Sequence, residues 1–166
     1  MLVVCIVAGC PRNEPALPIE EETGVAGELL SSVNVADPRA EEQLLEGFHD
    51  LEQLAWRWTE KRFSVALQPP EPVPGHRTAL EATISIPPMI IESLGPVTLS
   101  ASIDGTPVGS QTFSEAGQSL EFKQPVPDGV LSSLPVQAGF ELDKAIEPSE
   151  QDTRQLGLIV SAVQLQ

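Results

Sequence analysis

At 166 residues the chain has room for one ordinary domain and a tail, and such a domain can bury a hydrophobic core without metals or disulfide bridges. Its formal net charge is −15, from 9 Lys and Arg against 24 Asp and Glu. Binding to nucleic acid or to anionic lipid needs clustered basic residues, so this composition argues against both. The 16 prolines and 12 glycines favour sheet edges and loops over long helices.

The first predicted element is an apolar run from Leu2 to Ala8, which is too short to span a bilayer as a helix, a structure that needs about 20 residues. Its end, Val7-Ala8-Gly9-Cys10, resembles the lipobox of bacterial lipoproteins. The resemblance implies that residues 1–9 are a signal peptide and that Cys10 becomes the lipidated first residue. Because no Lys or Arg precedes the run, we expect the true start to lie upstream. The alternative is a buried N-terminal strand.

Residues 10–28 mix Pro, Glu and Gly without an apolar period, which is typical of a flexible tether. The two cysteines, Cys5 and Cys10, both lie in the first ten residues. The body at 29–166 therefore has no disulfide and no cysteine-bound metal, and it must rely on its core for stability.

One short helix is predicted over ADPRAEEQLLEG. Asp37 is a suitable N-cap, Pro38 fits the first helical position, and Gly47 is a plausible stop.

The rest of the body has the period of two that indicates strands with one buried face. In PVTLSASIDG, apolar residues alternate with Thr and Ser, and Asp104-Gly105 then supplies a two-residue hairpin turn. The last strand has a slip in register that a bulge can absorb. We therefore predict an all-β fold, an antiparallel, jelly-roll-like β-sandwich of about 7–8 strands with one short N-terminal helix. The other predicted strands are 29–35, 63–67, 78–86, 106–113, 119–123, 136–142 and 157–165.

Two motifs are distinctive: Gly47-Phe48, Glu52 and Arg57-Trp58-Thr59 near the start of the body, and Asp152-x-Arg154-x-Leu156-Gly157 before its last strand. Together with the hairpin residues Ile103-Asp104-Gly105, they resemble a small β-sandwich domain of bacterial proteins, sometimes found beside glycosyltransferases or methyltransferases of cell-surface polysaccharide assembly. The pattern is Gly-aromatic, Glu and Arg-Trp-Ser/Thr near the start, a hairpin in the middle and Asp-x-Arg-x-Leu-Gly near the end. The resemblance covers roughly residues 29–166 and implies the fold, without a stated activity.

These motifs contain the candidate binding residues. Glu52 and Arg57 can form an ion pair that pins the segment over the first strand, or they can hold sugar hydroxyls. Trp56 and Trp58 are two apart and share a face if they lie in a strand, so both pack inward, or one lies at a sheet margin within reach of a sugar ring.

Asp152 and Arg154 leave a similar choice between a turn-bracing salt bridge and a ligand contact. His49 and Asp50 near Glu52 fall short of a metal set, so we expect no metal and no cofactor.

Nucleophile, dinucleotide and phosphate-loop motifs are absent from the sequence. We therefore expect a non-catalytic lipoprotein of the bacterial cell envelope, on its periplasmic or surface side, which binds the membrane through Cys10 and surface polysaccharide through its domain. The alternatives are a structural or protein-interaction module that docks on an envelope protein, and a hydrolase, which would need two facing carboxylates.

Overall fold

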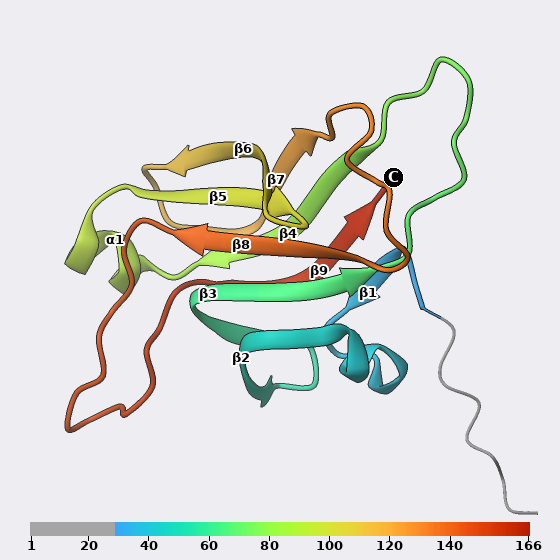
Figure 1. Ribbon diagram of the computed structural model, residues 1–166. Coiled ribbons are helices and arrows are strands. Elements are labelled where there is room, and N and C mark those ends of the chain that lie inside the picture. Colours follow the sequence, from blue (N-terminus) through green and yellow to red (C-terminus); the bar gives the residue numbers. More distant parts are fainter. Residues whose placement is uncertain (1–28) are drawn as a thin grey trace, which may run out of the picture.

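A computed structural model describes residues 29–166 (Figure 1). The leader, the tether and Cys10 lie outside these described residues. The helical elements are η1 (Pro38–Gln43), a 3₁₀-helix, and α1 (Pro88–Leu94). The strands are β1 (Ser32–Asn34), β2 (Leu44–Glu52), β3 (Trp56–Leu67), β4 (Ala79–Ile86), β5 (Val97–Ile103), β6 (Thr106–Phe113), β7 (Gly117–Pro125), β8 (Val136–Leu142) and β9 (Ile159–Leu165).

The strands form one antiparallel sheet, so the prediction of an antiparallel all-β fold is confirmed. The order is β6-β5-β8-β3-β9-β4-β7, with β1 added at β9 and β2 at β3. The sheet curls until β6 meets β7, where the Gln111 side chain donates to the Glu121 carbonyl at 3.1 Å and Gln124 donates to Ser110 at 3.2 Å. The two layers of the expected sandwich are thus two halves of one nearly closed barrel.

Strand β3 belongs to both layers. Near its start, Arg57 and Trp58 pair with β9, whereas residues 62–67 pair with β8. Strand β2 passes very close to β3 at Gly47. This residue has φ +73°, and a side chain there would overlap the Arg62 carbonyl oxygen. Gly47 therefore does not end a helix but lies within β2, at a position where only glycine fits.

The core lies between the two layers, and three phenylalanines connect them. Phe63 of β3 stacks on Phe140 of β8 at a centroid distance of 4.8 Å, and Phe122 of β7 meets Phe140 edge-on at 5.9 Å. All three side chains are buried. Burying one Phe stabilises the fold by about 1.5–3 kcal/mol. The predicted alternation is present in β5, where Val97, Leu99, Ala101 and Ile103 are buried.

The predicted helix from Asp37 to Gly47 is only partly right. Asp37 caps η1, since its carboxylate accepts from the Arg39 backbone N–H at 2.9 Å, and Pro38 is the first helical residue. The helix ends at Gln43, whose buried side chain donates to the Ala66 carbonyl at 2.7 Å and turns the chain into β2.

Helix α1 was not predicted. It spans seven residues between Pro87 and Gly95, and it packs on the core through Ile90, which is 1% exposed. Strand β4 ends at Ile86, as predicted, and Pro88 opens this helix, where a missing N–H costs nothing.

Two local predictions on strands correspond to features of the structure. Asp104 and Gly105 both have positive φ, at 48° and 79°, and form the turn between β5 and β6. The expected slip in the last strand is present at Ser161. Val160 and Ala162 of β9 pair with two successive residues of β4, so Ser161 between them is an extra residue.

Candidate functional site

The two sequence motifs lie side by side at the start of β3. The backbone N–H of Thr59 donates to the Leu158 carbonyl at 2.8 Å, and the N–H of Gly157 donates to the Thr59 carbonyl at 2.7 Å. His49 Nε2 lies 2.7 Å from the Gln155 carbonyl oxygen. Gly157 has no room for a side chain, since a Cβ would lie 2.6 Å from the Glu60 carbonyl oxygen. Much of the motif therefore serves close backbone packing.

Arg154 connects the motifs through two carboxylates. One guanidinium nitrogen lies 2.8 Å from Glu52 and another lies 2.9 Å from Asp152. The expected ion pair of Asp152 with Arg154 is therefore present, and the Asp152 carboxylate also accepts from the Arg154 backbone N–H at 3.0 Å. These contacts fix the end of β2 against the loop that leads into β9.

The hydrogen bonds from the Arg154 side chain, and then from its backbone N–H, lower the pKa of Asp152 to about 2. The same carboxylate, together with Glu52, raises the pKa of Arg154 above its usual value.

The predicted pair of Glu52 with Arg57 is wrong. In the hairpin of β2 and β3, Glu52 is opposite Trp56, and Arg57 is opposite Leu51. Arg57 and Glu52 therefore point to opposite faces. Arg57 instead donates to the carbonyls of Val35 and His49, at 3.1 and 3.2 Å, and it lies 3.6 Å from Glu41.

The two tryptophans share a face and differ in burial. Trp58 is 8% exposed and belongs to the core, whereas Trp56 is half-buried at the margin. Their rings meet edge-on, with centroids 6.5 Å apart and an interplanar angle of 79°. Trp58 thereby fixes the orientation of Trp56, and this corresponds to the second arrangement considered for the pair.

Trp56 lines a half-open groove of about 670 Å³. Pro88, the first residue of α1, also lines it, so the groove lies at the end of the barrel where Figure 1 shows α1. One wall is the tip of the β2–β3 hairpin, where Gln53 and Leu54 both have positive φ, at 51° and 56°. The rest of the lining comes from the starts of β3 and β9, the end of β4 with the first residue of α1, and the start of β7. The lining residues are Gln53, Ala55, Trp56, Ser85, Ile86, Pro87, Pro88, Ala116, Gly117, Gln118, Ser119, Ile159 and Ser161.

Trp56 is the only sequence-predicted binding residue among those that line this groove. Glu52 and Arg57 are in the neighbouring hairpin but do not line it. Sequence reasoning missed Gln53, Gln118 and the serines, since nothing in their local pattern tells which strand ends meet.

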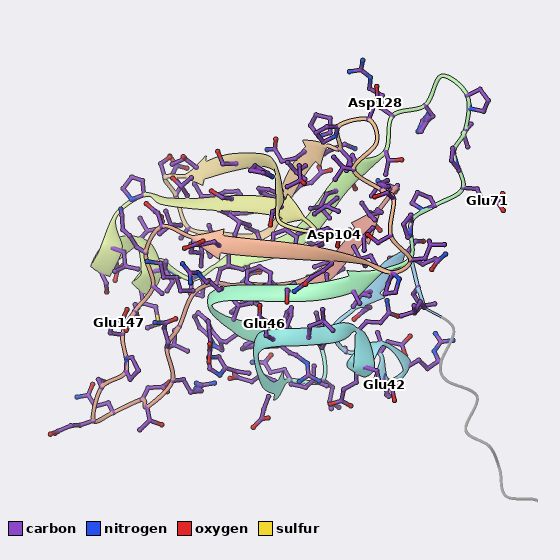
Figure 2. All side chains as sticks on the ribbon, in the orientation of Figure 1. Glu42, Glu46, Glu71, Asp104, Asp128 and Glu147 are labelled. Carbon is purple, nitrogen blue, oxygen red and sulfur yellow. The ribbon has the colours of Figure 1, made fainter. Side chains whose placement is uncertain are left out.

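The acidic side chains are spread over the molecule. Figure 2 shows Glu71 and Asp128 at one end and Glu147 at the other, on separate loops. Within residues 29–166, the ionisable side chains form no cluster of three or more with the spacing of a metal site. Neither helix of this range has the length or hydropathy of a membrane span.

Neither a protein-family model nor a curated protein matches the chain. The resemblance to a polysaccharide-associated domain therefore remains a prediction that rests on the motifs.

Proposed function

We propose that this protein is a non-catalytic binding module of the bacterial cell envelope, anchored by a lipid on Cys10, and that it holds a polysaccharide segment in the groove beside Trp56. The observation that carries the proposal is the lining of that groove, which combines a half-buried tryptophan with amide and hydroxyl side chains. Its volume of about 670 Å³ lies within the ordinary range of ligand sites, about 300–1,000 Å³.

This lining suits a sugar chemically. A sugar ring has an apolar C–H face that packs on the flat indole of Trp56, which is already oriented by Trp58. Sugar hydroxyls both donate and accept, as do the amide groups of Gln53 and Gln118. The open side of the groove leaves room for a chain to continue beyond the bound segment.

Binding is favoured over hydrolysis because the lining of described residues contains no carboxylate. Glycosidases that follow the common mechanism need two carboxyl groups, and one of these acts as an acid at the scissile bond. The motif carboxylate Glu52, which precedes the lining residue Gln53 in the chain, is already paired with Arg154.

The proposal can be tested by native affinity electrophoresis, with a broad set of bacterial surface polysaccharides in the gels. We expect at least one polymer to retard the wild type, and Trp56→Ala to weaken that binding at least about tenfold, equivalent to about 1.4 kcal/mol. Trp56→Phe should retain part of the affinity, because a flat ring remains. The control is Val73→Ala, a 62% exposed residue of the proline-rich loop. No retardation by any polymer would refute the carbohydrate proposal.

A protein-docking module is the second candidate, and one observation favours it. Leu54 and Met89 are 85% and 43% exposed, and each adjoins residues that line the groove. Exposed apolar side chains beside a groove are common at protein interfaces. A photo-crosslinking residue at position 54, but not at position 73, would then form an adduct with one envelope protein in cells, while no polysaccharide would bind.

A further inference from the structure

We infer that the groove takes an uncharged glycan segment and rejects anionic polysaccharide. This inference rests on the proposed function, and it specifies which class of polymer the groove can hold.

The first observation is the absence of ionisable side chains from the groove. Every lining residue among residues 29–166 is apolar, an amide, a hydroxyl or a glycine, although 20% of the whole chain is charged. A carboxylate or phosphate that entered this groove would lose water without gaining a cation. The cost of such an uncompensated charge exceeds what a few neutral hydrogen bonds return.

The second observation is that the basic residues are occupied elsewhere. Of the nine Lys and Arg, Arg12 lies outside the described residues, and only Lys61 and Arg77 form no ion pair within 4.0 Å with another described residue. Neither of these two lines the groove. The six in ion pairs are Arg39, Arg57, Arg62, Lys123, Lys144 and Arg154.

The third observation is that the groove has unused capacity for neutral hydrogen bonds. The Gln53 and Gln118 amides are exposed and make no hydrogen bond with other described side chains or backbone groups. The Ser85 hydroxyl oxygen accepts from the Ser119 N–H at 3.2 Å, so its own proton remains available. Ser161 donates to the Thr83 carbonyl at 3.2 Å, so its lone pairs remain. Donors and acceptors together match sugar hydroxyls, which need both.

Long-range electrostatics act in the same direction. The net charge of −15 repels a polyanion before it reaches the groove. Binding of a neutral segment, in contrast, should be nearly independent of salt, because it forms no ion pair that salt can screen.

The test compares each uronic-acid polysaccharide of the panel with its carboxyl-reduced form, which keeps the backbone and linkages and removes the charge. Binding of the full chain is measured for the wild type and for Trp56→Ala between about 0.02 and about 0.5 M NaCl. We expect the reduced form of at least one polymer to bind at least about tenfold more tightly than its acidic parent, with little change across the salt series. Gln118→Lys, which places a cation in the lining, should bring the acidic parent closer to the reduced form, whereas Gln118→Ala should not.

The outcomes separate the two proposals. If the acidic parents bind as tightly as the reduced forms, and Trp56→Ala abolishes the binding, the inference is overturned while the proposed function stands. If no polymer of either form binds, or if binding is unaffected by Trp56→Ala, the proposed site is wrong and the inference fails with it.

Discussion

Arg154 shows how one residue can organise a site without lining it. Its guanidinium binds Glu52 at the end of β2 and Asp152 in the loop before β9. The hairpin tip that follows Glu52 carries Gln53 into the groove. The motif that first suggested a ligand contact therefore holds the wall of the groove in place.

The variant Asp152→Asn should lose less thermal stability than the wild type when the pH is lowered. The pKa of Asp152 is about 2 in the folded protein, below its usual 3.8. Between these values the unfolded state binds more protons, so the stability that Asp152 contributes is present above about pH 4 and is lost as the pH falls towards 2. The variant lacks this titration and should start from a lower Tm at neutral pH.

The measurement is Tm by circular dichroism between about pH 6 and pH 2. The wild type should lose more Tm than Asp152→Asn across this range. Asp128→Asn, at an exposed loop position in which the carboxylate has no ion pair with another described residue, serves as the control and should follow the wild type. Parallel curves for the wild type and Asp152→Asn would contradict the prediction.

Gly47→Ala should be far more damaging than Gly75→Ala. Both glycines have positive φ, at +73° and +80°, so both variants incur the same backbone strain of about 1–2 kcal/mol. A Cβ at position 75 meets nothing within 4 Å, whereas at position 47 it overlaps the backbone of β3. We expect Gly47→Ala to cost at least about 2 kcal/mol more than Gly75→Ala. Urea unfolding gives both values, and equal costs would show that β2 does not press on β3 at this point.

At the scale of the elements, the sequence predicted β5, whose apolar and polar residues alternate, but it missed β2 and the first part of β3, since the predicted strand began only at residue 63. β5 keeps its period of two, because one face packs on the core throughout. β2 has three shifts of register against β3, which destroy any period, and its residues therefore suggested the end of a helix. Helix α1 was missed because it is only seven residues long and has no side-chain cap.

Of the candidate site, the sequence predicted what lies within one strand but not what other elements contribute. That Trp56 and Trp58 share a face follows from their spacing in one strand. Apart from the hairpin tip, the other lining residues lie at the junction of β4 and α1, at the start of β7 and in β9, and only the order of strands in the barrel brings these segments to Trp56. The Glu52–Arg57 pair failed because the prediction lacked β2 and therefore the hairpin register.

Ile90→Ala should destabilise the protein, and Met89→Ala should not. The two residues are neighbours in α1, but Ile90 is 1% exposed and Met89 is 43% exposed. The cavity left at Ile90 should cost about 2–4 kcal/mol, while the surface change at Met89 should stay within about 0.5 kcal/mol. Chemical unfolding of both variants measures this difference. A small effect of Ile90→Ala would mean that α1 contributes little to the core.

At the scale of the whole molecule, the proposed anchor is separable from the fold. If Cys10 carries the lipid, Cys10→Ala should abolish palmitate labelling in bacteria and release the protein from membranes. The Tm of the domain should not change, because Cys10 precedes the described residues. Cys5→Ala is the matched control and should keep both the label and the membrane fraction. Labelling that persists in Cys10→Ala would refute the lipoprotein proposal.

The long strand β3 separates the groove from the point where the described chain begins. The carbonyl of Leu30, near the start of the described chain, accepts from the N–H of Gln68, just beyond the last residue of β3. Trp56 is the first residue of this 12-residue strand, on the order of 35 Å away along its path. A chain held from its N-terminal side would therefore present the groove at its distal end. In the proposed lipoprotein the tether would join the domain at the end opposite the groove, so attachment to a membrane would leave the mouth of the groove uncovered.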